Sequence, residues 1–208
     1  MSDAPRVHPT AIVEPGVMLG ARTAIWDNVH LRGPSHIGKD CIVGEKTYVA
    51  YGVTIGDGVK INAHVYVCTA VTIEDRVMIA AGVIFTNDRY PRAFDEDGGL
   101  ASSDPNAETL ATVVRSGATL GAGALVGPGL EIGAYAMVGM GAVVTRDVPA
   151  HALVVGSPAR VAGFVCVCGT RLAGGTAPSE DPCARCGRRH VFVDGPGGRA
   201  LSVVGRDA

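Results

Sequence analysis

The sequence lacks three features that would place it in a common class of proteins. It has no excess of basic residues, since 18 Lys and Arg stand against 20 Asp and Glu for a formal net charge of −2. A nucleic-acid role therefore has no electrostatic support. No apolar stretch approaches the roughly 20 residues that a membrane-spanning helix needs. The first residues also lack a charged segment followed by an apolar one, so we expect a soluble, cytoplasmic protein with no secretory signal and no membrane partner.

What the sequence does contain is a hydrophobic period of six. An aliphatic or aromatic residue recurs at every sixth position through one block, and the period resumes in a second block one residue out of phase. The first block comprises Val13, Leu19, Ile25, Leu31, Ile37, Val43, Val49, Ile55, Ile61, Val67, Ile73, Ile79 and Phe85, and the second comprises Val114, Leu120, Val126, Ile132, Val138 and Val144. This period fits neither the turn of an α-helix nor the simple alternation of a strand. It predicts an all-β solenoid of short strands and tight corners, a parallel hexapeptide β-helix.

The period also divides the chain into segments. We expect the β-helix to span residues 8–148, with a long inserted loop over 88–112 that carries no period and is rich in Asp, Gly, Ser and Pro. A long irregular loop inside a regular array usually serves binding or catalysis. Residues 149–163 form an exit segment beyond the last repeat.

If three hexads make one turn, residues three hexads apart should stack from coil to coil. His30, Tyr48, Tyr66 and Ile84 have this spacing at outward positions. We expect them to form a line on one face of the solenoid. Such a line would serve as a subunit interface, as a wall of a substrate cleft, or as both.

A cysteine-containing appendage follows the exit segment. Cys166, Cys168, Cys183 and Cys186 form two close pairs joined by a short segment, and a glycine follows each pair. Four thiolates suit a tetrahedral zinc site, and a site closed by four cysteines has a structural role. We therefore predict a zinc-ribbon-like module over residues 164–194 and a tail over 195–208, with free or redox-active thiols as the alternative.

A more specific motif lies where the first block meets the loop. Phe85-Thr86-Asn87 is followed by Pro91-Arg92. In this segment the chain resembles the hexapeptide-repeat nucleotide-sugar N-acetyltransferases that act on 3-amino sugars, such as the UDP-2-acetamido-3-amino-glucuronate and dTDP-3-amino-3,6-dideoxyhexose N-acetyltransferases. Other matching stretches are His8–Ile12, Ile25-Trp26, Val29-His30, Val71–Asp75, Val114–Gly121 and Val154–Arg160. The resemblance implies a left-handed β-helix and a homotrimer with its sites between subunits.

The resemblance also implies a reaction and an active-site residue. The enzyme would be an acetyl-CoA-dependent N-acetyltransferase, in which the amine of a UDP- or dTDP-linked amino sugar attacks the thioester directly. The active-site residue of the family falls on Asn87, whose side-chain oxygen can accept a proton from the amine while its amide donates. His64 is a candidate general base, since imidazole titrates near physiological pH, and Glu74 could orient it. The alternatives are an Asx-turn at Asn87, structural or solvated roles for the other two, and a mechanism with no dedicated base.

The remaining candidates concern substrate and cofactor. Asp88, Tyr90 and Arg92 begin the loop, and the guanidinium of Arg92 suits a sugar-nucleotide diphosphate or a loop-anchoring ion pair. The resemblance implies pantetheine contacts along a column of residues three hexads apart and an arginine near the 3′-phosphate or adenine of CoA. These positions are Ala122, Met140, Pro158 and Arg160.

Other functions remain open at this point. An O-acyltransferase would need a firmer general base, because a hydroxyl is less nucleophilic than an amine. A trimeric scaffold that lost activity but kept its zinc is the non-enzymatic alternative. A γ-type carbonic anhydrase is disfavoured, because His30, His36 and His64 do not supply a pair of zinc ligands close in sequence. The sequence does not decide between UDP and dTDP, the position of the amine or the length of the acyl chain.

Overall fold

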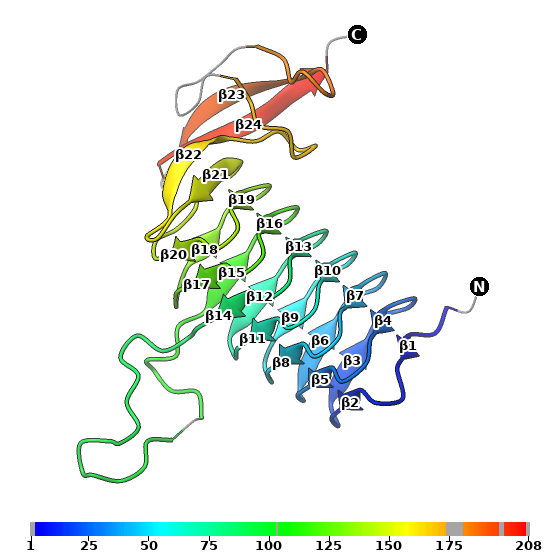
Figure 1. Cartoon of the computed structure of the whole chain (residues 1–208), viewed down its shortest axis with the longest axis vertical. Coiled ribbons are helices and arrows are strands. Elements are labelled where there is room, and N and C mark those ends of the chain that lie inside the picture. Colours follow the sequence, from blue (N-terminus) through cyan, green and yellow to red (C-terminus); the bar gives the residue numbers. More distant parts are fainter. Residues whose placement is uncertain (1–2, 103, 174–180, 196–197, 207–208) are drawn as a thin grey trace.

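The computed structural model describes residues 3–102, 104–173, 181–195 and 198–206. These residues form strands, corners and loops without a helix, and the strands wind into a parallel solenoid (Figure 1). The predicted all-β solenoid is therefore confirmed. No helix in the described part of the chain could span a membrane. The cytoplasmic location stays a prediction.

Three parallel sheets form the faces of the solenoid. Sheet A contains β1 (Arg6–Val7), β4 (Ala24–Ile25), β7 (Ile42–Val43), β10 (Lys60–Ile61), β13 (Met78–Ile79), β16 (Thr119–Leu120), β19 (Met137–Val138) and β21 (Ala152–Val155). Sheet B contains β2 (Ile12–Val13), β5 (His30–Leu31), β8 (Tyr48–Val49), β11 (Tyr66–Val67), β14 (Ile84–Phe85), β17 (Leu125–Val126) and β20 (Val143–Val144). Sheet C contains β3 (Val17–Leu19), β6 (Ser35–Ile37), β9 (Thr54–Ile55), β12 (Val71–Ile73), β15 (Thr112–Val114) and β18 (Glu131–Ile132).

Corners join the three sheets along three edges. The AB edge comprises residues 8–11, 26–29, 44–47, 62–65, 80–83, 121–124 and 139–142. The BC edge comprises 14–16, 32–34, 50–53, 68–70, the corner at 86–87 that opens the loop, and 127–130. The CA edge comprises 20–23, 38–41, 56–59, 74–77, 115–118 and 133–136. A positive φ recurs at these corners, as at His64 with 57° and Gly82 with 71°.

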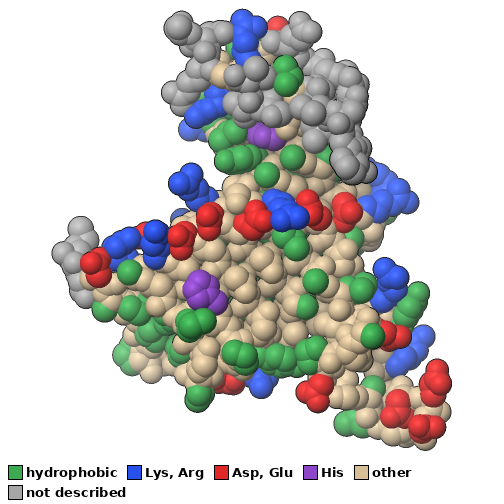
Figure 2. Space-filling view, turned by 180° about the vertical axis from the view of Figure 1, so that it is seen from behind, with side chains coloured by type: hydrophobic (Ala, Val, Ile, Leu, Met, Phe, Trp, Pro, Cys, Tyr) green, Lys and Arg blue, Asp and Glu red, His purple; other side chains and the backbone are tan. Residues whose placement is uncertain are grey.

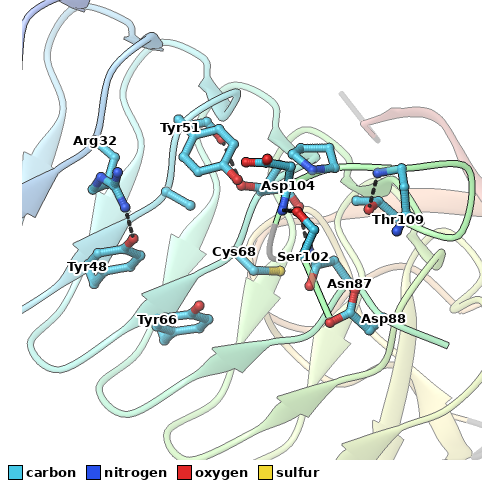
Figure 3. Close-up of a pocket in the computed structure, with 14 residues that line it drawn as sticks. Arg32, Tyr48, Tyr51, Tyr66, Cys68, Asn87, Asp88, Ser102, Asp104 and Thr109 are labelled. Atoms are coloured by element: carbon cyan, nitrogen blue, oxygen red, sulfur yellow. Dashed lines mark hydrogen bonds between the residues drawn. The ribbon is translucent and has the colours of Figure 1, made fainter. Parts of the chain in front are cut away.

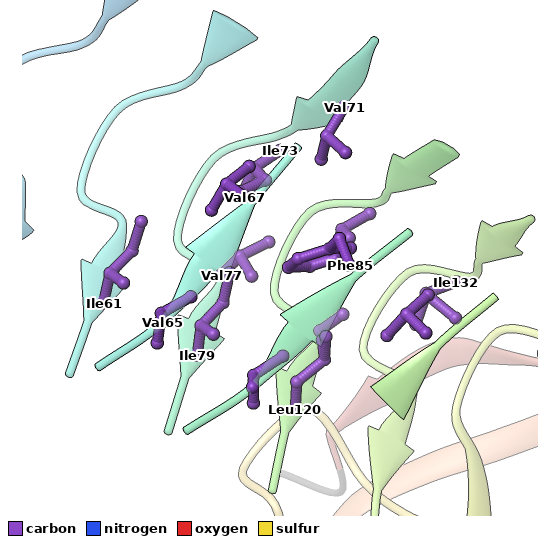
Figure 4. Packing of buried hydrophobic residues seen from close by; sticks show 14 of the residues in the cluster. Ile61, Val65, Val67, Val71, Ile73, Val77, Ile79, Phe85, Leu120 and Ile132 are labelled. Carbon is purple, nitrogen blue, oxygen red and sulfur yellow. The ribbon is translucent and has the colours of Figure 1, made fainter. Parts of the chain in front are cut away.

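The hydrophobic period fills the interior. The period residue of most strands is buried while its neighbour faces out, as in β10, where Ile61 is buried and Lys60 is exposed. Buried period residues from the three sheets meet along the axis (Figure 4). Phe85 is the largest of the fully buried side chains. This continuous core explains why the repeats fold only as a stack, because one coil cannot bury its own apolar residues.

The register follows the predicted spacing with two exceptions. Ile61 pairs with Ile79 three hexads on, whereas Phe85 pairs with Val126 on the far side of the loop. The number of residues that the loop adds to this coil is one less than a multiple of six. The hydrophobic period of the second block is therefore shifted by one residue from that of the first. The last coil is shorter than three hexads, because Val138 pairs with Val154.

The loop leaves the solenoid as a projecting arm between β14 and β15 (Figure 1). Its base is closed by an antiparallel bridge between Asp88 and Thr109, and the Leu110 amide donates to the Asn87 carbonyl at 2.9 Å. The second arm of the loop thus returns to the BC edge where the first arm left it.

The appendage covers the C-terminal end of the solenoid. Strand β22 (Arg160–Phe164) pairs antiparallel with β21, and β23 (Arg188–Gly195) and β24 (Gly198–Arg206) form a hairpin. The predicted tail at 195–208 thus differs from the structure, where residues 198–206 form the second strand of that hairpin. Leu201 of β24 is buried and joins the core.

Candidate active site

A hollow of about 260 Å³ lies on the BC edge beneath the returning arm of the loop (Figure 3). The solenoid supplies Arg32, Tyr48, Tyr51, Tyr66, Cys68, Thr69 and Asn87 to its lining, and the loop supplies Asp88, Ser102, Asp104, Asn106 and Thr109. Of the residues predicted from the sequence, Asn87 and Asp88 meet here.

Asn87 stands at the junction of solenoid and loop. It follows β14 and stacks one coil above Thr69, to whose carbonyl its Nδ2 donates at 3.5 Å. Its own carbonyl accepts the Leu110 amide. The backbone is therefore fixed while the side-chain oxygen accepts no hydrogen bond from another described residue. An amide held this way can accept from or donate to a ligand in the hollow.

Two members of the predicted line, Tyr48 and Tyr66, form one wall of the hollow. The predicted stacking is confirmed: Tyr48 pairs in register with His30 on one side and with Tyr66 on the other, and Tyr66 pairs with Ile84. The rings of Tyr48 and Tyr66 are parallel, with centroids 5.2 Å apart, and His30 meets Tyr48 edge-on at 5.5 Å.

The guanidinium of Arg32 lies in the same wall and is held there by its neighbours. The Arg32 Nε lies 2.9 Å from Glu14 Oε1, its Nη1 donates to the Tyr48 hydroxyl at 3.3 Å, and it sits over the Tyr51 ring. Glu14 also bonds the His30 ring at 2.8 Å. The pKa of the Glu14 carboxyl is lowered, chiefly by His30 and also by Arg32. These bonds hold Arg32 in place at the rim.

Cys68 lies at the base of the hollow. Its side chain is buried, and desolvation raises the pKa of the thiol to about 12. The group is therefore a neutral thiol at physiological pH and contributes shape rather than charge to the site.

His64 lies on the AB edge, across sheet B from Asn87, so one subunit does not bring the two together. Its side chain is exposed. Ala122 and Met140 share that edge and stack as predicted, since the Gly141 amide donates to the Ala122 carbonyl at 2.9 Å. Pro158 does not continue the column, because the short last coil places Gly156 next to Met140 instead.

Glu74 belongs to the third edge. On the CA edge its carboxylate accepts from Arg115 Nη1 at 2.8 Å and from the Ser116 amide at 2.9 Å. These bonds lower its pKa, with the Arg115 contact as the largest cause. The expected orientation of His64 by Glu74 is not seen, because the two residues lie on different edges of the solenoid.

The other loop and exit residues are exposed. Tyr90 and Arg92 line a second hollow of about 570 Å³ between the arms of the loop, and Asp88 lines both hollows. Arg92 Nη1 donates to the Pro91 carbonyl at 2.9 Å. Arg160 donates to the Ala159 carbonyl at 2.8 Å and its side chain is exposed at the end of the solenoid.

The four appendage cysteines converge. All four sulfur atoms lie within 4.8 Å of one another, with Cys166 and Cys186 at 3.4 Å and Cys168 and Cys183 at 3.6 Å. Zn–S bonds of about 2.3 Å in a tetrahedron require sulfur atoms roughly 3.8 Å apart, so the donor set fits zinc. Gly169, with a φ of 82°, donates its amide to the Cys166 carbonyl three residues back at 2.8 Å, and Gly187, with a φ of 67°, donates to the Cys183 carbonyl four residues back at 2.8 Å.

Sequence reasoning missed several residues of the main hollow. Thr69 stands three hexads before Asn87 and Tyr51 a further three hexads before that, so the stacking rule that served for the aromatic line could have found them. Asp104 and Thr109 reach the hollow only because the loop folds back, and no period marks them.

Family models and individual proteins match this architecture. The model for the bacterial transferase hexapeptide (six repeats) matches residues 52–87, and that for the hexapeptide repeat of succinyl-transferase matches 34–69 and 112–146. The second match resumes where β15 begins, so the two models leave out the loop.

The chain is 43% identical over 84 residues to a dTDP-3-amino-3,6-dideoxy-α-D-galactopyranose 3-N-acetyltransferase of Aneurinibacillus thermoaerophilus, which covers 40% of this chain and 42% of that protein. It is 36% identical over 58 residues to an acyl-[acyl-carrier-protein]–UDP-N-acetylglucosamine O-acyltransferase of Brucella ovis, covering 28% and 21%. The match thus spans less than half of each relative.

Among solved structures, the acetyltransferase domain of PglB from Neisseria gonorrhoeae, in complex with acetyl coenzyme A, has a TM-score of 0.51 at 19% identity, covering 77% of this chain and 58% of that one. This likeness concerns the fold. Two stretches of the chain, 34–87 and 112–146, thus match the hexapeptide repeats of bacterial transferases, and over part of its length the chain is similar to a nucleotide-sugar N-acetyltransferase.

Proposed function

We propose that this protein is an acetyl-CoA-dependent N-acetyltransferase that acylates the amino group of a nucleotide-linked amino sugar. The observation that carries the proposal is Asn87, which is held by its backbone at a hollow while its side-chain oxygen accepts nothing from the other described residues. The 43% identity to a 3-amino-sugar N-acetyltransferase supports a 3-amino acceptor.

The proposed active site needs two subunits. Sheet B exposes an apolar column in which Ile12 is 56%, Tyr66 45%, Ile84 41% and Leu125 40% exposed. A contiguous apolar face of this kind marks an interface. If three copies bury their B faces around a threefold axis, the BC edge of one copy meets the AB edge of the next. Asn87 of one subunit then faces His64, Ala122 and Met140 of its neighbour.

In this site the chemistry is an acyl transfer by direct attack. The amine nitrogen forms a bond to the thioester carbonyl carbon, the C–S bond breaks, and the proton that the amine loses ends on the CoA sulfur. The side-chain oxygen of Asn87 accepts a hydrogen bond from the amine and directs its lone pair toward the thioester. The carboxylates of Asp88 and Asp104, which line the hollow, offer hydrogen-bond acceptors to the amine of the acceptor.

The acceptor and CoA would bind at different parts of the solenoid. Tyr90 and Arg92 would contact the acceptor from the loop, with Arg92 toward its diphosphate. CoA would run along the AB edge past Ala122 and Met140, where small side chains expose the backbone, toward Pro158 and Arg160 at the end of the solenoid. Zinc would be held by Cys166, Cys168, Cys183 and Cys186 as a structural ion, since four thiolates leave no position open for a substrate.

A second function is favoured by one observation. The identity to an O-acyltransferase acting on UDP-N-acetylglucosamine fits a hydroxyl acceptor. In that reaction His64 would serve as the general base, because a hydroxyl must lose its proton as it attacks.

The test is release of the CoA thiol from acetyl-CoA over a panel of UDP- and dTDP-linked 3-amino and 4-amino sugars, with the matching hydroxyl sugars as controls. Turnover with an amino sugar and none with its hydroxyl counterpart is expected. Turnover with the hydroxyl sugars alone would establish the O-acyltransferase instead. Silence across the panel together with no CoA binding would refute both.

A further inference from the structure

Trp26 is the one tryptophan of the chain, and it is 47% exposed on a rigid corner of the AB edge. Its amide donates to the Val43 carbonyl at 3.0 Å, so its backbone belongs to the ladder of sheet A. An indole half in water on a fixed backbone offers a preformed flat surface, and this surface lies outside the core.

Hollows lie on both sides of the indole. One, of about 310 Å³, lies between Trp26 and Arg6, whose guanidinium sits 5.6 Å from the ring centroid. The other, of about 320 Å³, runs from Trp26 past Glu45 and Asn62 to Ala63 and Ala81. The second hollow is therefore continuous with the edge that carries His64.

The polar side chains of the second hollow are uncommitted within the described part of the chain, since those of Glu45 and Asn62 form no hydrogen bond to another described residue. Arg6 is engaged on the first side, where its guanidinium lies over the indole. A side-chain amide can donate to and accept from the edge of a nucleobase. Together with an open indole face, this set matches a nucleotide rather than an alkyl chain.

The position of Trp26 along the solenoid agrees with the proposed reaction. Trp26 follows β4, Asn87 follows β14, and Ala122 and Met140 follow β16 and β19. The indole thus lies on the N-terminal side of the amine site and the CoA column on its C-terminal side. Trp26 and Asn87 are three coils apart, roughly 14 Å at about 4.8 Å per coil. A pentose and a diphosphate separate the base from the amino sugar, so the base must lie several coils from the amine.

We propose that Trp26 stacks on the nucleobase of the acceptor from the side of the second hollow, with Asn62 contacting the edge of the base and Arg6 supporting the opposite face of the indole. This subsite rests on the proposed function and extends it, since it assigns the nucleotide end of the acceptor to the AB edge of the subunit opposite Asn87. Stacking tolerates any base, so the indole supplies affinity and Asn62 supplies the choice between bases.

The test uses the fluorescence of this one tryptophan in the full-length protein. Titration with UDP, dTDP or inorganic pyrophosphate should quench the emission with the two nucleotides and leave it unchanged with pyrophosphate. By calorimetry, Trp26→Ala should weaken dTDP or UDP binding by roughly 10- to 100-fold, as for loss of one base–aromatic stack, while CoA binding is unchanged. Trp26→Phe should retain most of the affinity. Met18→Ala is the matched control, because Met18 is 61% exposed on sheet C, away from the AB edge.

The outcomes separate this subsite from the function on which it rests. Nucleotide binding by calorimetry with unchanged fluorescence, or equal affinity for wild type and Trp26→Ala, would overturn the subsite and leave the enzyme proposal standing. No binding of either nucleotide to the wild-type protein would overturn both. The fluorescence arm needs no variant, so a folding defect in Trp26→Ala does not affect it.

Discussion

The CA and AB edges of the solenoid share one corner geometry but differ in how their side chains are used. On the CA edge, charged groups bond from coil to coil: Arg22 binds Asp40 at 2.6 Å, and the Asp57 carboxylate accepts the Lys39 amide at 3.0 Å. Figure 2 shows acidic and basic side chains gathered in a band across the solenoid. These contacts hold successive corners in register.

The AB edge has no such ladder among the described residues. It carries Trp26, His64, Ala63, Ala81 and Ala122, which are small or form no ion pair with a described residue. The difference teaches that the corners can stack without charged contacts on every edge, since the BC edge shares the pattern in the Glu14–Arg32 pair and the AB edge does not. The AB edge is therefore free to carry groups that we expect to contact ligands or other subunits.

The largest effect on turnover is expected from a substitution on the BC edge, compared with one on the CA edge. Asn87→Ala should lower kcat about 100- to 1,000-fold, because an oriented amide at the reacting centre contributes on this scale, with CoA affinity nearly unchanged. Glu74→Gln, on the CA edge, should leave kcat within about threefold and lower the melting temperature, because it weakens the bond to Arg115. Steady-state kinetics and thermal melts measure both. Near-normal turnover in Asn87→Ala, or a hundredfold loss in Glu74→Gln, would reverse the assignment.

The next effect compares two faces instead of two edges. Ile84→Glu places a charge in the apolar column of sheet B and should dissociate a trimer, with association weakened about 100-fold or more, because an unpaired buried charge is costly. Thr72→Glu is the matched control, since Thr72 is exposed at the same outward position on sheet C. Analytical ultracentrifugation reads the mass of each variant. A wild-type monomer, or a trimer in Ile84→Glu, would exclude sheet B as the interface.

The third prediction contrasts the solenoid with its appendage. The chain should carry one zinc ion, and chelation should speed amide exchange in β22, β23 and β24 by about tenfold or more while the coils of the solenoid keep their protection. The reason is that a short segment around four cysteines has little core of its own. Cys183→Ser should likewise speed amide exchange in the three strands of the appendage. Cys41→Ser, in the solenoid core, should not speed exchange in those strands. A protein with no metal that ignores chelators would refute the zinc site.

The solenoid could be predicted from the sequence because its period reports the fold directly. Each period residue must be apolar to fill a narrow core, so the strands, the stacking of His30 on Tyr48 and the boundaries of the loop followed from spacing. The short last coil and strand β24 did not, since neither the shortened spacing from Val138 to Val154 nor a lone hairpin leaves a periodic mark.

The candidate site was predicted in part, for physical reasons. Asn87 was found from the resemblance at Phe85-Thr86-Asn87, and Asp88 because it begins the aperiodic loop. Glu74 was wrongly paired with His64, because the chain between them passes the BC corner at 68–70 and reaches the CA edge. Arg32 was missed because its role depends on a bond to Glu14, one coil earlier, and Asp104 because the path of an aperiodic loop is set by tertiary contacts.

The smallest expected effect concerns the junction of appendage and solenoid, where two histidines are buried together. His190 and His151 are 5% and 4% exposed with ring centroids 6.0 Å apart, and neither ring nitrogen of His190 has a hydrogen-bond partner among the described residues. Desolvation lowers the pKa of both imidazoles, and Arg188 adds to the effect at His190. Below about pH 6.5 the unfolded chain therefore binds protons that the folded chain does not, so stability falls as the pH drops through this region.

We expect the free energy of unfolding from denaturant melts to fall by about 1 kcal/mol between pH 7 and 5.5, and to fall by less in His190→Phe. His64→Phe, on the exposed AB edge, should keep the wild-type dependence. All three proteins retain the cysteines, so protonation of a zinc site would affect them equally, and identical pH profiles would show that the buried pair does not control the junction.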